Sequence, residues 1–328
     1  MESPLLSLPG AVAADRPDQE VAAHYGEPAH EQRALESGTA FVDRSNRGVV
    51  RVSGPDRLSW LHSLLSQHLD RLEPHRPTQA LLLSPNGHVE HHLHLVDDGE
   101  AVWAHVEPGT ASALVEFLDR MRFMLRVEVA DVTGEYAVVT GAVDVPGALE
   151  LPDVAGPSRI IERSALPGLP EAARPAGLWA YEAFRIAAHR PRLGLDTDHR
   201  TIAHEAGWIG EAVHLDKGCY RGQETVARVH NLGRPPRRLV MLHLDGSADR
   251  LPAHGDPVEL NGRTVGFTGS AARHHELGPI ALAMVKRTVP VDATLLAGGV
   301  AAAQEVVVSP DTGANADIAL RRRPAARS

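Results

Sequence analysis

The pattern of apolar and polar positions predicts strands and helices in turn along the N-terminal part of the chain. Residues 80–83 are an apolar run, and residues 49–52 are apolar except for Arg51; both segments are bounded by turn residues, as is typical of strands. Leu58, Leu61 and Leu64 recur at helical spacing after a Ser-Gly-Pro-Asp turn, which predicts a helix that begins near the proline. Further runs of both kinds follow in β-α-β order. This order predicts an α+β region in which helices pack on sheets.

After residue 235 the pattern changes to short strands separated by Gly, Asp and Pro turns, which indicates a small antiparallel barrel or sandwich. No internal repeat is evident. We therefore expect four segments: a flexible leader at 1–20, an α+β region of two subdomains at 21–235, a C-terminal β-barrel at 236–309 and a disordered basic tail at 310–328.

Composition and charge narrow the class of protein. A chain of 328 residues exceeds what one core usually supports, so two or three lobes are expected. The net charge of −9 argues against direct nucleic-acid binding, which needs clustered basic residues. No apolar run approaches the length of about 18 residues that spans a membrane, and the N-terminus does not resemble a secretion signal. We expect a cytoplasmic protein without a membrane partner.

One strand carries an unusual set of histidines. Alternation places His88, Glu90, His92 and His94 on one face and His91 on the apolar face. Side chains two positions apart on a strand are separated by about 7 Å, so they do not easily converge on one ion. We therefore expect a polar strand face and assign no metal site.

The segment from residue 216 to 230 carries the strongest candidate chemistry, because it holds the one cysteine of the chain, Cys219. Lys217 and Arg221 flank this thiol, and a helix is predicted to open after Gly222. A thiol near cations and a helix N-terminus has more thiolate character than a free cysteine, which predicts an exposed, activatable Cys219. The residues alone leave open a small buried cysteine in a loop. One cysteine also excludes an intrachain disulfide and a cluster held by cysteines of one chain.

The stretch 217–224, K-G-C-Y-R-G-Q-E, resembles the K-G-C-[aromatic]-x-G-Q-E signature of the YgfZ family. These proteins are relatives of the glycine-cleavage T-protein that bind folate and assist iron–sulfur proteins. The resemblance extends from about Phe41 to near Val308. It implies a T-protein-like folate-binding fold of two interleaved α+β lobes plus a small C-terminal antiparallel β-barrel.

The resemblance also implies roles for individual residues. Cys219 would be the functional thiol and Lys217 would support it, while Glu205 would accept N–H donors from the pterin of tetrahydrofolate. Arg185 could bind the glutamate tail of the folate, or pair with Glu182 one helical turn away. Trp208 or Tyr220 could cover the ring. The further residues assigned to the folate site are Tyr220, Gly218, Gly222, Gln223 and Glu224, of which the last two could instead shape the turn.

The sequence and the resemblance leave three candidate functions. The first is a tetrahydrofolate-binding accessory protein that assembles or repairs iron–sulfur clusters in client enzymes, which could include radical enzymes that modify tRNA, with a cluster held transiently. The second is a folate-dependent aminomethyl or methyl transferase or demethylase, and the third is a protein-binding scaffold with a vestigial folate pocket. Related aminomethyltransferases carry aspartates where this chain has histidines near His91. A histidine does not supply the same fixed negative charge, so aminomethyl transfer of the glycine-cleavage kind is not expected.

Overall fold

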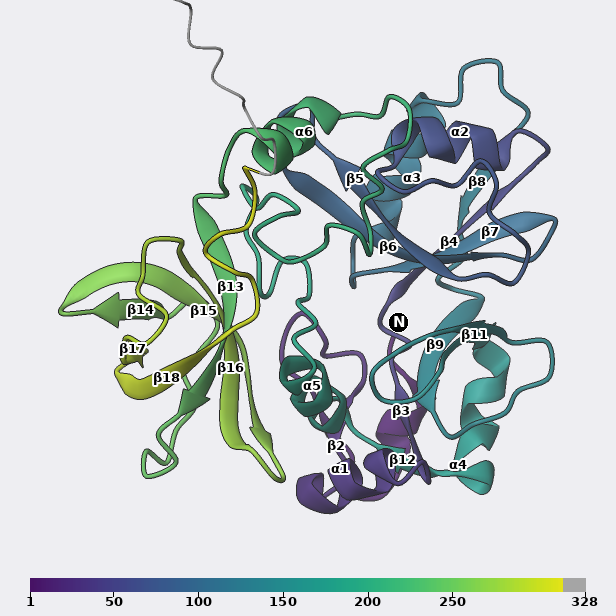
Figure 1. Ribbon diagram of the computed structural model, residues 1–328. Coiled ribbons are helices and arrows are strands. Elements are labelled where there is room, and N and C mark those ends of the chain that lie inside the picture. Colours follow the sequence, from purple (N-terminus) through teal and green to yellow (C-terminus); the bar gives the residue numbers. More distant parts are fainter. Residues whose placement is uncertain (315–328) are drawn as a thin grey trace, which may run out of the picture.

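Residues 1–314 are described in the computed structural model, and they form two five-stranded sheets, a two-stranded sheet and a closed barrel (Figure 1). The first large sheet has the strand order β5 (Thr78–Leu83), β6 (Val89–Asp97), β7 (Ala101–Val106), β4 (Gly48–Ser53) and β8 (Glu128–Asp131). The second has the order β10 (Leu149–Leu151), β11 (Ser158–Glu162), β9 (Tyr136–Gly141), β3 (Ala40–Asp43) and β12 (Arg174–Ala176). Strand β3 pairs with β9 and β12, so the whole first sheet is inserted in sequence between partners of the second. The two lobes are therefore interleaved.

Helices cover each large sheet with apolar side chains. Helices α2 (Arg57–Leu64) and α3 (Ala111–Arg120) bury Trp60, Leu114 and Leu118 against the first sheet. In the second lobe, α1 (Pro28–Glu36) and α5 (Leu178–Ala187) pack beside the sheet and contribute Leu35 and Tyr181 to its core. This lobe also contains η1 (Pro4–Ser7), β1 (Val12–Ala13), β2 (Ala22–His24), η2 (Arg163–Gly168) and α4 (Leu169–Ala172).

The C-terminal region forms the predicted barrel. Its strands close in the order β13 (Arg237–Leu244), β16 (Gly278–Lys286), β15 (Arg263–His274), β14 (Pro257–Leu260), β17 (Leu295–Ala297) and β18 (Val300–Val306). Helix α5 contributes Ala183 and Ile186 to an apolar cluster with the outer face of the barrel. It therefore lies between the second lobe and the barrel (Figure 1). The remaining helix, α6 (Gln223–Asn231), precedes the barrel.

The first twenty residues do not form the flexible leader that the sequence predicts. Leu5 is only 2% exposed and packs in the core of the second lobe, against Phe41. The Ser3 hydroxyl donates to the buried carboxylate of Asp43. Asp18 is also buried. The prediction fails because isolated contacts, rather than a periodic apolar stripe, hold this segment. At the other end, the predicted disordered tail is 310–328. Residues 310–314 are described, and Asp311 there accepts from Arg234 at 2.8 Å, whereas residues 315–328 lie outside the described residues.

A buried ion-pair network connects the parts of the molecule. Arg192 lies between three carboxylates, with N–O distances of 2.9 Å to Asp18, 3.0 Å to Glu107 and 3.1 Å to Glu182. Asp18 belongs to the N-terminal segment, Glu107 follows β7 of the first lobe, and Glu182 lies on α5. Burial alone would raise the pKa of Glu182, but Arg185 and Arg192 outweigh burial and hold this pKa at about 2. The carboxylate therefore stays ionised.

The network continues into the barrel. Arg185 donates to Glu182 at 3.1 Å and to Asp196 at 2.8 Å. The second oxygen of Asp196 accepts the backbone N–H of Ser270, in β15, at 2.7 Å. These contacts join both lobes and the barrel through buried and largely buried charges, whose removal one at a time is costly.

We expect Arg192→Ala to destabilise the protein by about 3–5 kcal/mol, because three largely buried carboxylates would lose a shared cation. Chemical denaturation measures this change. Arg120→Ala is the control, since Arg120 and its partner Glu116 are exposed and such pairs contribute about 0–1 kcal/mol. Equal destabilisation by the two substitutions would contradict the role given to the network.

Candidate functional site

A central cavity of about 490 Å³ lies where the two lobes and the barrel meet. Its wall includes β5 and β6 of the first lobe, α5 of the second, and Val307 after the last barrel strand. The polar and aromatic residues that line it are Arg44, Arg47, Gln79, His92, His94, Glu107, Asp153, Tyr181, Arg185, His189, Arg190, Arg192, Trp208 and Glu211. A concave site with convergent polar groups is the usual form of a small-molecule site.

Every carboxylate on this wall is already paired with an arginine. Glu107 accepts from Arg47 at 2.8 Å and also pairs with Arg192. Asp153 accepts from Arg44 at 2.6 Å, and the guanidinium of Arg44 lies 4.0 Å from the ring centroid of Tyr181. Glu211 is bound by Arg190. The charges are therefore held in place by one another, and the wall offers fixed donors and rings rather than a free base.

Histidine rings form a second part of the wall. The ring centroid of His92 lies 4.8 Å from that of Trp208 and 4.6 Å from that of His94. The ring of His94 stacks on that of His105, with 4.8 Å between the centroids and 6° between the planes. Burial lowers the pKa of His92 to about 4 and also holds the pKa values of His94 and His105 well below the usual range. These imidazoles are therefore neutral at physiological pH. They present an uncharged aromatic surface suited to a planar ring.

Hydrogen bonds fix the orientation of two of these rings. The Nε of Arg47 donates to Nδ1 of His105 at 2.8 Å, so the ring proton of His105 is on Nε2. Nε2 of His92 lies 2.8 Å from the side-chain amide oxygen Oε1 of Gln79, to which it donates in the neutral ring. The wall is thus ordered before any ligand binds.

A β-bulge changes the predicted face of the histidine strand. Leu82 pairs with His91 but Leu83 pairs with Val89, so Glu90 is an extra residue in β6. His92 lines the cavity with His94, whereas Glu90 is exposed and the predicted four-residue face is broken. His91 faces the other side, and its buried Nδ1 has no hydrogen-bond partner among the described residues. Burial lowers the pKa of His91 to about 4.

The second glycine of the K-G-C-Y-R-G-Q-E stretch docks this stretch onto the first lobe. Gly222 precedes α6 with φ of 79°, and a Cβ there would lie 2.5 Å from the carbonyl oxygen of Ser84. Gly87 lies in the same β5–β6 turn, and a Cβ placed on it would lie 2.5 Å from the Cβ of Thr225 in α6. The Thr225 hydroxyl donates to the carbonyl of Asn86 at 2.8 Å. Only glycine allows this approach of the two backbones.

Cys219 is exposed and lies outside the central cavity. The ammonium of Lys217 donates to the carbonyls of His62 and Leu65 at the end of α2, the latter at 2.5 Å, and burial lowers the pKa of Lys217 to about 8. Arg221 pairs with Glu90 at 2.8 Å. Both predicted cations are therefore bound to other groups. They hold the loop in place, and direct support of a thiolate by Lys217 stays a prediction.

Glu205 also has a different environment from the predicted one. Its side chain is 1% exposed, and both carboxylate oxygens accept from Arg237, at 2.9 and 2.8 Å. Oε2 also accepts the backbone N–H of Ile202. Glu205 does not line the cavity, but the residues that follow it, up to Trp208, do. Recognition of a ring by Glu205 stays a prediction that requires the pair with Arg237 to open.

The other assigned residues fall into two groups. Arg185 lines the cavity, and it makes the ion pair with Glu182 that the sequence left as an alternative. The remaining four, Tyr220, Gly218, Gln223 and Glu224, lie outside the cavity, as Cys219 does. The Tyr220 ring packs on apolar residues, and the ammonium of Lys217 lies 4.9 Å from its centroid. The backbone N–H of Tyr220 donates to the Gln223 side chain at 3.0 Å, which closes the turn. Gly218 and Glu224 are exposed, and no atom lies within 4 Å of a Cβ placed on Gly218.

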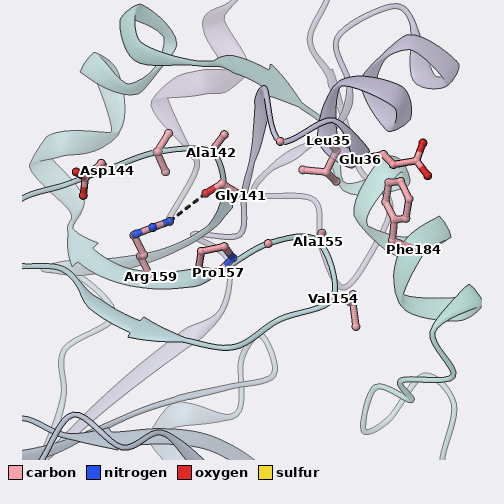
Figure 2. A pocket seen from close by; sticks show the side chains of 13 residues that line it. Leu35, Glu36, Gly141, Ala142, Asp144, Val154, Ala155, Pro157, Arg159 and Phe184 are labelled. Carbon is pink, nitrogen blue, oxygen red and sulfur yellow. Dashed lines mark hydrogen bonds between the residues drawn. The ribbon is translucent and has the colours of Figure 1, made fainter.

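A second, larger cavity of about 680 Å³ lies next to the second sheet (Figure 2). Small residues and backbone around Gly141, Ala155 and Pro157 form much of its wall, with Phe184 at one side. Its arginine, Arg159, donates to the Gly141 carbonyl at 3.0 Å. Because few polar groups converge there, the central cavity is the better candidate for a specific ligand.

Among residues 1–314, no group of three or more His, Cys, Asp or Glu side chains is placed to hold a metal ion. In the same part of the chain, no helix is long and apolar enough to cross a membrane.

Comparisons with known proteins agree with this architecture. The sequence-family model of the glycine cleavage T-protein C-terminal barrel domain matches residues 237–325. The crystal structure of the glycine cleavage system aminomethyltransferase T from Bartonella henselae superposes with a TM-score of 0.75 at 17% identity, over 92% of this chain and 94% of that chain. The chain thus has the T-protein fold, with two α+β lobes and a closed C-terminal barrel.

Sequence relatives carry two kinds of name. The chain is 27% identical over 309 residues to an aminomethyltransferase of Rubrobacter xylanophilus, covering 82% of each protein. It is 26% identical over 291 residues to a chloroplastic protein of Arabidopsis thaliana named as a transferase, covering 75% of this chain and 66% of that protein. It is 28% identical over 229 residues to a mitochondrial iron–sulfur cluster assembly factor of Mycosarcoma maydis, an IBA57 homolog, covering 60% of this chain and 55% of that protein.

The two glycines around Cys219 give a matched test of the docked loop. We expect Gly222→Ala to destabilise the protein by about 1–3 kcal/mol and to alter the rate at which iodoacetamide alkylates Cys219, because the new Cβ would displace the turn. Gly218→Ala should change neither quantity, since its Cβ would point into open space. Thermal unfolding and mass spectrometry measure the two effects. Identical behaviour of both variants would refute this account of the loop.

Proposed function

We propose that this protein is a tetrahydrofolate-binding accessory protein that assembles or repairs iron–sulfur clusters in client enzymes, with Cys219 as its functional thiol. The proposal places the folate in the central cavity and the client at the exposed loop. It includes the YgfZ-like assignment, the cytoplasmic location and the radical enzymes that modify tRNA as clients.

The observation that carries the proposal is the separation of the thiol from the cavity. Cys219 is exposed on an ordered loop, whereas the cavity lies between the lobes and the barrel. Cys219 is not part of the cavity wall, so a ligand contained within that wall would not contact its sulfur. A thiol in such a position is accessible to a macromolecular partner, so its chemistry is better suited to a client protein than to the bound small molecule.

The cavity supports a folate-type ligand through its chemistry. A pterin is a planar ring with hydrogen-bonding edges, and the neutral surface of His92, His94 and Trp208 suits stacking with such a ring. Arg44, Arg47 and Arg190 provide donors around it, although each is already paired. A volume of about 490 Å³ is within the usual range for small-molecule sites.

The names of the relatives support two activities, and the state of the cavity carboxylates bears on the choice between them. The aminomethyltransferase names support folate-dependent group transfer as a second candidate. That reaction benefits from a carboxylate able to stabilise developing positive charge or to move a proton. The carboxylates of this cavity, Glu107, Asp153 and Glu211, are each bound to arginine. The iron–sulfur assembly name of the Mycosarcoma relative supports the first candidate.

Replacing Cys219 by Ser should separate ligand binding from client activation. We expect the variant to keep its fold and its affinity for tetrahydrofolate, because the side chain is exposed and outside the cavity. Restoration of activity to a cluster-depleted [4Fe–4S] dehydratase should fall to the background rate. Anaerobic calorimetry measures the affinity, and enzyme assays measure the restoration.

The matched control is Ala227→Ser, an exposed substitution on α6, which should leave both quantities unchanged. Full restoration by Cys219→Ser would refute the proposed role of the thiol. Aminomethyl transfer to tetrahydrofolate by the wild-type protein would favour the second candidate.

A further inference from the structure

Large apolar side chains are exposed on the turn between α3 and β8. Phe123 is 81% exposed, Met124 98% and Leu125 43%, and the first two are the most exposed large apolar residues in the described part of the chain. Contiguous apolar side chains in solvent mark interaction surfaces more often than scattered ones do. We refer to Phe123, Met124 and Leu125 as the apolar tip.

The apolar tip is held in a fixed position at both ends. On the α3 side, the carbonyl of Met121 accepts the indole N–H of Trp60 at 3.1 Å. On the β8 side, the backbone N–H and the guanidinium of Arg126 donate to Asp56 at 2.9 and 2.8 Å. The exposure is therefore a property of an ordered turn. A preorganised contact loses less conformational entropy on binding.

The charges around the tip are matched. Three arginines near the turn each pair with a carboxylate, at N–O distances of 3.5, 3.5 and 2.8 Å: Arg120–Glu116, Arg122–Asp119 and Arg126–Asp56. Such a rim has no basic excess to attract anionic lipid, and the chain as a whole has a net charge of −9. An apolar centre with a mixed polar rim is instead the composition of a protein–protein interface.

The loop that carries Cys219 lies on the same helical layer. Lys217 donates to the Leu65 carbonyl at the end of α2, and the guanidinium of Arg221 lies 4.8 Å from the ring centroid of Phe117 on α3. Helices α2 and α3 pack together on one face of the first sheet (Figure 1). The apolar tip extends directly from the end of α3, so this layer carries both features.

We propose that the apolar tip and Cys219 form one docking surface, on which the tip binds the iron–sulfur client that the thiol serves. This inference rests on the proposed function. The partner is a folded protein that presents an apolar pocket with a polar rim of both charges, beside the cysteine or cluster that meets Cys219. The tip supplies affinity and the thiol supplies chemistry, so the two contributions separate in kinetics.

The test measures how fast a cluster-depleted [4Fe–4S] dehydratase regains activity anaerobically with equal amounts of ferrous and ferric iron and with sulfide. The dehydratase concentration is varied against a fixed amount of this protein. The double variant Phe123→Ser, Met124→Ser should need about tenfold more dehydratase for half-maximal rate, with the maximal rate unchanged. Both side chains lie in solvent, so the fold should be preserved. The control Leu277→Ser removes a 46% exposed apolar residue from the barrel and should behave as wild type.

Parallel measurements separate the possible failures. An inactive Cys219→Ser protein together with an unchanged half-saturating concentration in the tip variant would overturn the docking inference and leave the proposed function standing. A fully active Cys219→Ser protein would overturn the proposed function itself. Sedimentation with vesicles containing phosphatidylserine tests the other occupant. Binding by wild type that the tip variant loses would assign the tip to a membrane and overturn the inference.

Discussion

The arrangement of this molecule depends on paired charges that are largely removed from solvent. Arg192 holds carboxylates from the N-terminal segment, the first lobe and α5, and Arg185 extends the network through Asp196 to the barrel. Each buried charge would be costly alone, so each part of the chain is stabilised only when the others are in place. A central cavity lined by polar groups can exist at this junction because the same ion pairs satisfy its wall.

The same constraint separates two kinds of chemistry. Inside, burial keeps His92, His94 and His105 neutral and arginines hold the carboxylates, so the cavity is a preformed binding surface. Outside, Cys219 lies on a loop held by Gly222 against the β5–β6 turn. A ligand bound between the lobes and the barrel could stabilise their arrangement and the loop docked on them. This provides a physical route by which a cavity ligand and a surface thiol could work together.

The sequence predicted what depends on periodicity and on the resemblance. The apolar stripe of α2, the short barrel strands and the interleaved T-protein-like lobes were all accessible, and so was an exposed Cys219. The packing of Leu5, the bulge at Glu90 and the ion pair between Glu205 and Arg237 were not. Each depends on a partner distant in sequence, and none produces a local pattern. Arg47, Glu107 and Arg192 were missed for the same reason, since strand ends and loops carry no periodic signal.

The most direct test of the central claim is a crystal structure of the protein with tetrahydrofolate, grown and soaked without oxygen. The account predicts the pterin ring in the central cavity, stacked on the surface of His92, His94 and Trp208, with Cys219 free of ligand contact. A ring bound at the cavity beside Gly141 and Phe184, or against Cys219, would contradict the separation of ligand and thiol. An empty central cavity at saturating folate would contradict the assignment of the ligand itself.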